Sequence, residues 1–209
     1  MYLRTRAALS AALSTLALAA LAAPAAQANA LSLLPGSCGN QPESQPFAQW
    51  GDQSEYTPAP GGSFESGNAS WQLSGGAAVT SGNETFYVNS KTDSHSLSLP
   101  AGSSAVSPAA CTNIAQPTAR LFVRNTGSAS SRLTVQALYP ALVGGTATTT
   151  IGVLTGTSNW EPSPTLSLAT ANLLATLSLQ STTIAFEFTP SGAGNWNIDD
   201  VYIDPYARG

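Results

Sequence analysis

Apolar and polar side chains alternate along two stretches in the second half of the chain. From Leu133 to Tyr139 every second residue is apolar, and the same holds from Ile184 to Phe188. An alternation with a period of two residues is typical of a β-strand that buries one of its faces. Each stretch therefore predicts a half-buried antiparallel strand.

Shorter apolar stretches, separated by turns rich in Gly, Pro, Ser and Asn, predict further strands. They span residues 71–73, 77–80, 86–88, 97–99, 121–123, 149–153 and 166–168. Only 170–177 is ambiguous, because its leucines also fit two turns of helix. Many short strands at this spacing are typical of a sandwich or barrel. We predict a single all-β domain, an antiparallel β-sandwich.

The first 30 residues have the features of a signal peptide. Arg4 and Arg6 precede an apolar run over 7–23, and Ala28-Asn29-Ala30 supplies the small residues before a cleavage site. A membrane anchor is the alternative, but Ser and Thr interrupt the apolar run. We therefore expect a secreted protein with no membrane span after leader removal. We expect an irregular segment at 31–62, rich in Pro, Gly and Gln, before the sandwich at 63–209.

Charge argues against one class of partner. Without the two leader arginines the chain keeps 5 basic and 11 acidic residues, a net charge of −6. Nucleic-acid binding needs clustered Lys and Arg, so nucleic acid is not an expected partner. Charged residues make up 9% of the chain, against about a quarter in ordinary globular proteins. This composition suits an extracellular β-protein, and we expect a monomer.

The two cysteines, Cys38 and Cys111, are expected to form a disulfide. An oxidising compartment favours the bond, and closing so long a loop stabilises the fold by about 4 kcal/mol in the chain-entropy model. A redox pair or a metal site is the alternative. The chain has no Cys-x-x-Cys spacing and a single histidine, which makes both alternatives less favoured. The bond would tie segment 31–62 to the middle of the domain.

The C-terminal stretch 195–204 places two carboxylates among large apolar residues. In a regular strand Asp200 shares a face with Trp196 and Ile198, while Asp199 lies on the other face with Val201. A buried carboxylate is costly unless it is paired, hydrogen-bonded or bound to a cation. Basic partners are scarce, which favours Ca²⁺. Alternatively, both aspartates lie in water at a bulge or strand end.

Several short motifs carry a resemblance to a known family. Phe-Glu-Ser-Gly-Asn at 64–68 leads to Trp71 and to Gly-Gly-Ala at 75–77, and the chain closes with Trp-Asn-Ile-Asp-Asp-Val-Tyr-Ile at 196–203. Over residues 63–204 these motifs resemble the jelly-roll, galactose-binding-like carbohydrate-binding modules of secreted glycoside hydrolases.

The resemblance implies a fold, a partner and an ion. The opening and closing segments would lie side by side in a jelly roll, with a structural calcium near their junction. Glu65, together with Asp199 or Asp200, would supply its acidic ligands. The partner would be a glycan or cell-surface polysaccharide, bound weakly. An extracellular structural or adhesive scaffold without a small ligand is the alternative.

Sugar rings pack on exposed aromatic side chains. Tyr87 lies opposite Phe86 and Val88 in the pattern, and Trp160 lies in a loop-like setting, so we predict Tyr87 and Trp160 as ligand-binding residues. Trp71 and Trp196 fall on alternating stretches and are expected in the core.

An enzyme is the competing class of function. His95 lies beside Asp93 and Ser94, but members of a catalytic triad normally come from distant segments, and the chain has no Gly-x-Ser-x-Gly motif. A glycosidase could pair Glu187 with Glu161 or Glu84, which only their separation in space would decide. We predict a non-catalytic domain.

Overall fold

The computed structural model describes residues 42–68, 70–114, 116–178 and 183–204. The predicted leader and Cys38 lie outside these residues, so the signal peptide and the pairing of Cys38 with Cys111 stay predictions. Cys111 ends strand β6 (Ala110–Cys111), and no cysteine among the described residues is free. No helix in the described ranges is long and apolar enough to cross a membrane.

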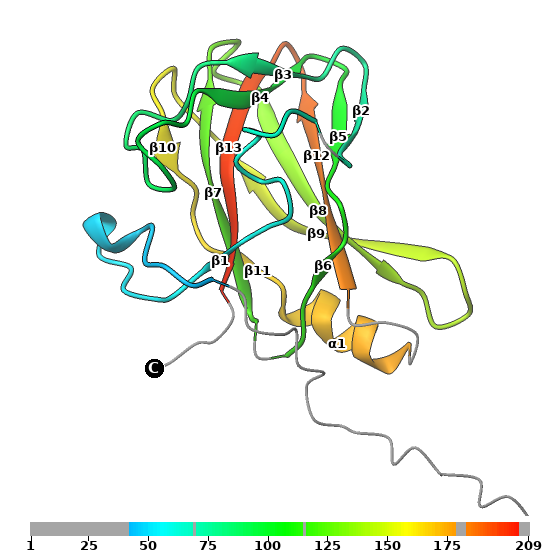
Figure 1. The fold of residues 1–209 in the computed structure, drawn as a ribbon. Helices are drawn as coiled ribbons and strands as arrows, with labels where there is room; N and C mark the ends of the chain where they lie inside the picture. The colour runs from blue at the N-terminus through cyan, green and yellow to red at the C-terminus, as the bar shows by residue number, and fades with distance from the viewer. Residues whose placement is uncertain (1–41, 69, 115, 179–182, 205–209) are drawn as a thin grey trace, which may run out of the picture. The chain divides into compact units, whose positions relative to one another are not determined.

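Two antiparallel sheets face each other (Figure 1). The first has the order β10-β7-β13-β4-β3, with β1 on β13 and β11 on β7. Its strands are β1 (Thr57–Pro58), β3 (Ala78–Ser81), β4 (His95–Pro100), β7 (Thr118–Asn125), β10 (Glu161–Pro162), β11 (Leu166–Ser167) and β13 (Asn195–Asp204). The prediction of an all-β, jelly-roll sandwich is confirmed.

The second sheet has the order β2-β5-β12-β8-β9, with β6 beside β12. Its other strands are β2 (Gln72–Ser74), β5 (Ser104–Val106), β8 (Arg132–Pro140), β9 (Thr146–Leu154) and β12 (Thr183–Ser191). Arg132 and Glu187 are the only charged residues on the strands of this sheet, so it is almost uncharged.

The main core lies between the sheets. The alternating stretches found in the sequence form β8 and β12, which bury one side chain in two. Their buried residues meet Leu97 and Leu99 of β4 and Ile198 of β13. Trp71 and Trp196 are buried in this core, as predicted.

A second, smaller apolar cluster covers the outer face of the first sheet. Phe47 and Tyr56 of the N-terminal segment pack there on Phe122 of β7, with the Phe47 and Phe122 rings stacked at 5.3 Å. The segment contains the short helix η1 (Ala48–Trp50) and joins the sheet through β1. Its described part, residues 42–62, contains little regular structure and packs on the sheet.

A bulge in β13 resolves the two-sided pattern of the C-terminal stretch. The register with β7 shifts between Asp199 and Tyr202, and Asp200 adopts φ 46°. Before the bulge Ile198 points into the main core, and after it Val201 does so. The extra residue therefore directs both carboxylates to the outer face of the sheet.

Two further sequence expectations are decided by the structure. Residues 86–88, predicted as a strand, form a turn instead, because the side chain of Glu84 binds their backbone N–H groups. The ambiguous stretch at 170–177 belongs to helix α1 (Ala169–Leu177), which buries Ala171 and Ala175.

Close approach of two turns requires glycine at position 75. Gly75 has φ 61°, and a Cβ atom there would lie 2.4 Å from the carbonyl oxygen of Gly102. We expect Gly75→Ala to lower the free energy of unfolding by about 3 kcal/mol, through backbone strain and the clash together. Gly144→Ala is the control, since Gly144 has φ 90° and nothing within 4 Å; it should cost about 1 kcal/mol. Equal losses in urea unfolding would contradict the role of the clash.

Candidate functional site

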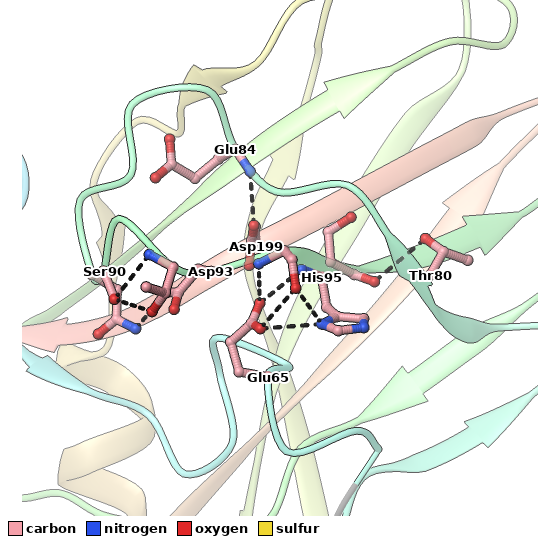
Figure 2. A network of polar contacts seen from close by, with 11 residues as sticks. Glu65, Thr80, Glu84, Ser90, Asp93, His95 and Asp199 are labelled. Atoms are coloured by element: carbon pink, nitrogen blue, oxygen red, sulfur yellow. Dashed lines mark hydrogen bonds and ion pairs between the residues drawn. The ribbon is translucent and has the colours of Figure 1, made fainter.

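Five carboxylates gather on the outer face of the first sheet. The bulge of β13 supplies Asp199 and Asp200, and the loop that joins β3 to β4 supplies Glu84 and Asp93. Glu65 lies in the turn before Trp71, and its negative charge contributes to raising the pKa of Asp200. Figure 2 shows four of them: Glu84 and Asp93 on the loop, Asp199 on β13, and Glu65 on the segment that faces the start of β4. The structure thus brings the opening and closing motifs together, as the resemblance implied.

Asp199 and Glu84 act as acceptors for backbone N–H groups. Asp199 Oδ2 accepts the N–H of Glu84 at 2.9 Å, and Oδ1 accepts that of Asp200 at 2.9 Å. The carboxylate of Glu84 in turn accepts the N–H groups of Phe86 and, at 2.7 Å, Val88. Asp199 and Glu84 are both 0% exposed. These two buried side chains therefore fix the path of the loop.

Glu65 holds the start of β4. Its Oε1 atom accepts the N–H groups of Ser94 at 2.8 Å and His95 at 2.7 Å, and its Oε2 atom lies 3.1 Å from His95 Nδ1. Burial alone would raise the pKa of Glu65, but the hydrogen bonds from His95 and Ser94 lower it below its ordinary value. His95 thus serves as a partner of Glu65. Ser94 Oγ also lies 3.1 Å from His95 Nδ1, so the serine and the glutamate approach the same ring nitrogen, whereas a catalytic triad uses both nitrogens.

Asp200 is a buried carboxylate with an incomplete set of hydrogen bonds. Its side chain is 2% exposed, and its Oδ2 atom is buried without a hydrogen-bond partner. Burial raises the pKa of Asp200, and the charges of Glu84 and Asp93 raise it further. Burial and the charge of Asp200 also raise the pKa of Asp199. Neither aspartate has a Lys or Arg ion pair among those found in the described residues, so no basic side chain there offsets the cost of ionising these two buried groups.

The donor set suits a hard cation. Asn83 Oδ1 and Ser96 Oγ, on the segments flanking the cluster, are also buried without partners. Carboxylate, amide and carbonyl oxygens are the ligands that Ca²⁺ takes. Within the described ranges no group of three or more His, Cys, Asp or Glu side chains could hold a metal ion by itself. A calcium ion at Asp200 would therefore need amide, hydroxyl or carbonyl oxygens beside the carboxylates.

Three aromatic residues next to this cluster are accessible to solvent. Trp50 is half-buried, while Phe86 and Tyr87 are 38% and 47% exposed. The rings of Trp50 and Phe86 meet edge to face at 4.7 Å, and both pack on Phe122. Tyr87 has φ 54°, a conformation that a bulky residue rarely adopts. We call Trp50, Phe86 and Tyr87 the aromatic surface.

A polar cleft of about 480 Å³ adjoins the aromatic surface at Trp50. Arg120 Nη1 and Tyr56 Oη each donate to Asp52 Oδ2 at 2.7 Å. Two further guanidinium N–H groups bind the carbonyl of Ser163, and the guanidinium lies over the ring of Phe47. Ser54, Thr118, Thr165 and Asp204 complete the polar part of the lining. Flat rings beside fixed polar groups form a surface on which a sugar can stack and hydrogen-bond.

The structure exposes one of the two predicted ligand-binding residues and buries the other. Tyr87 is exposed, but residues 86–88 do not form the predicted strand and Phe86 is partly exposed as well. The role of Tyr87 in ligand binding stays a prediction. Trp160 is only 6% exposed and lies against the guanidinium of Arg124, so it anchors a loop and does not belong to the ligand surface.

Sequence reasoning missed Trp50 and Arg120. Trp50 could have been found from its neighbours in the sequence. Phe47, Trp50 and Tyr56 are three aromatic residues in a segment otherwise rich in Pro, Gly and Gln. Arg120 gave no local signal. The carboxylate pairs considered for a glycosidase are separated, because Glu187 lies on the second sheet while Glu161 and Glu84 belong to the first sheet and its loop.

No protein-family model and no curated protein matches this sequence. Among solved structures, it is similar to the C-terminal family 22 carbohydrate-binding module of a Clostridium thermocellum xylanase, with 18% identity over 70% of this chain and 93% of that one, and a TM-score of 0.47. It is also similar to a family 61 module bound to β-1,4-galactotriose, with 16% identity over 68% of this chain and 94% of that one, and a TM-score of 0.44.

A third similar structure is a xylanase fragment from Clostridium thermocellum that joins a family 22 module to a catalytic module. It gives a TM-score of 0.49 and 12% identity, and 68% of this chain spans only 27% of that one. The chain is thus similar to jelly-roll carbohydrate-binding modules, as its motifs predicted. At TM-scores below 0.5 the similarity gives no evidence about a ligand.

Asp52 should contribute to acid sensitivity. Burial alone would raise its pKa, but hydrogen bonds from Tyr56, Arg120 and Ser54 lower it below the ordinary value. The contribution of Asp52 to stability is therefore present above about pH 4 and is lost as pH falls through its lowered pKa. We expect Asp52→Asn to cost about 1 kcal/mol at pH 6 and almost nothing at pH 2, by urea unfolding.

The matched control is Glu55→Gln, which neutralises an exposed carboxylate of the same segment. It should leave the pH profile close to that of the wild type. A constant difference between Asp52→Asn and the wild type from pH 6 to pH 2 would show that the carboxylate charge of Asp52 does not stabilise the fold.

Proposed function

We propose that this chain is a secreted, non-catalytic domain that binds a glycan weakly and is stabilised by calcium. The observation that supports glycan binding is the aromatic surface beside the polar cleft. Exposed aromatic rings are normally isolated in soluble proteins, whereas here Trp50 and Phe86 are in contact and Tyr87 follows directly.

The chemistry of the two surfaces is complementary to a pyranose chain. The C–H face of one sugar would stack on the aromatic surface, since aromatic rings bury apolar area at low entropic cost. Hydroxyl groups of the next sugar would donate to Asp52 and accept from Arg120 in the cleft. Asp52 is already oriented by Tyr56 and Arg120, so little ordering would be needed on binding.

Calcium would be held at the bulge of β13. Asp200 offers the unpartnered Oδ2 atom, and Asp199 and Glu65 are the further carboxylates expected from the sequence motifs. Asn83 Oδ1 and Ser96 Oγ could add neutral ligands. The bound ion would supply the positive charge that the buried carboxylates lack.

Removing the aromatic surface should weaken glycan binding. We expect Tyr87→Asn and Trp50→Phe to lower the affinity for a polysaccharide that the wild type binds by about tenfold, or about 1.4 kcal/mol. Asn is chosen at position 87 because it tolerates positive φ. Affinity electrophoresis against a panel of neutral and acidic soluble polysaccharides measures the effect.

Leu142→Ala is the control, because Leu142 is 61% exposed in the turn between β8 and β9, away from the aromatic surface. It should bind like the wild type. If none of the polysaccharides retards the wild type, or if both aromatic variants bind unchanged, the glycan proposal is wrong.

Calcium should raise the melting temperature. At a calcium concentration 100 times Kd the native state gains about 2.7 kcal/mol, which corresponds to about 5–10 °C for a domain of this size. The comparison is between calcium and a chelator in differential scanning calorimetry. An identical melting temperature in both buffers would argue against a structural ion.

Asp200→Asn tests the position of the ion. Asn keeps the left-handed backbone conformation but removes the buried charge. The variant should melt above the wild type in chelator, and calcium should no longer shift it. Glu187→Gln, which removes a charge from the second sheet, should keep the calcium shift of the wild type. A normal shift in Asp200→Asn would place the ion elsewhere.

A further inference from the structure

The loop that joins β3 to β4, residues 82–94, contains no helix or strand and is folded around carboxylates. Asp199 binds the N–H of Glu84, and Glu84 binds those of Phe86 and Val88. At the far end Glu65 binds the N–H groups that lead into β4. Hydrogen bonds to buried negative charge therefore set the loop conformation.

The same loop carries two of the three residues of the aromatic surface. Phe86 and Val88, on either side of Tyr87, are both held by Glu84. Between them Tyr87 adopts φ 54° and exposes its ring. A bulky residue keeps such a conformation only when the surroundings over-determine it. The orientation of the Tyr87 ring therefore depends on the carboxylate of Glu84.

The acceptors that hold the loop also repel one another. Asp199, Asp200, Glu84 and Asp93 are each at most 9% exposed, and the charges of Glu84 and Asp93 act directly on Asp200. A divalent cation would remove the repulsion and leave the carboxylate oxygens free to accept N–H groups. Without a cation, the repulsion favours opening of the loop, because an opened loop returns the charges to water.

We infer that a divalent cation bound at the buried carboxylates and a glycan bound at the aromatic surface each strengthen the binding of the other, through loop 82–94. This inference rests on the proposed glycan function and adds a regulation to it. The glycan needs the ordered loop, and the cation favours that order by removing the repulsion among the carboxylates. By thermodynamic linkage the two affinities change by one common factor.

Calorimetric titration measures the coupling. The wild type is titrated with the best-binding polysaccharide in millimolar calcium and, separately, in chelator. We expect an affinity about tenfold higher in calcium, within the usual range for coupled sites. Calcium titrated into the glycan-saturated protein should show the same factor relative to the free protein.

Hydrogen exchange provides a readout that needs no glycan. Backbone amides of residues 84–89 should exchange several-fold more slowly in calcium than in chelator, while those of β8 and β12 should not change. Glu84→Gln should weaken glycan binding in calcium yet keep the calcium shift in melting temperature, because Asp200 is intact. Thr85→Ala, an exposed neighbour on the same loop, should behave like the wild type in both respects.

The outcomes separate the two ideas. If no polysaccharide binds in either buffer, the proposed function fails and the coupling fails with it. If a polysaccharide binds equally well in calcium and in chelator, the glycan function stands and the coupling is wrong. If the affinities differ but the backbone amides of residues 84–89 exchange at the same rate in both buffers, the loop does not couple the two sites, and the inference is overturned.

Discussion

One extra residue in β13 determines where the chemistry of this protein lies. Without the bulge, either Asp199 or Asp200 would point between the sheets, among Trp196, Ile198 and the aromatic residues of β12. After the bulge, the apolar side chains of β13 point into the main core again from Val201 onwards, and both carboxylates lie on the outer face. Asp199 then anchors the loop by accepting the N–H of Glu84, and Glu84 in turn holds the backbone of Phe86 and Val88.

The outer face of the first sheet has a layer of its own. The N-terminal segment contributes Phe47, Trp50 and Tyr56, and the 82–94 loop contributes Phe86 and Val88. They meet on Phe122, which links the aromatic surface to the floor of the cleft. The residues of the aromatic surface thus lie on irregular segments supported by a rigid sheet, a common arrangement for binding sites.

Sequence patterns predicted the sandwich well where a strand buries one face and exposes the other to solvent. The stretches on β8 and β12 and the buried positions of Trp71 and Trp196 follow from simple alternation. The motif resemblance also predicted that Glu65 lies near the terminal aspartates, and its charge acts on Asp200. These features are local, or are carried by short motifs, so a single sequence can reveal them.

The rest depends on contacts between distant residues. The apolar alternation at 86–88 indicated a strand, but the carboxylate of Glu84 captures its backbone N–H groups and makes a turn. The bulge is invisible in the sequence because either face of a regular strand looked equally mixed. Trp160 gave the same loop signal as an exposed aromatic, but it packs in the second apolar cluster and under the guanidinium of Arg124.

The near absence of charge on the second sheet makes the molecule electrically two-sided. Arg132 and Glu187 roughly balance there, whereas the first sheet and its loops hold Asp52, Asp204 and the carboxylates around the bulge. Among the described residues only Lys91, Arg120 and Arg124 offset those carboxylates on this side. In dilute salt we therefore expect a negatively charged matrix to repel the first sheet more than the second. The cleft then faces away on first contact, so the rate of productive encounter with an anionic polymer rises as salt screens the field.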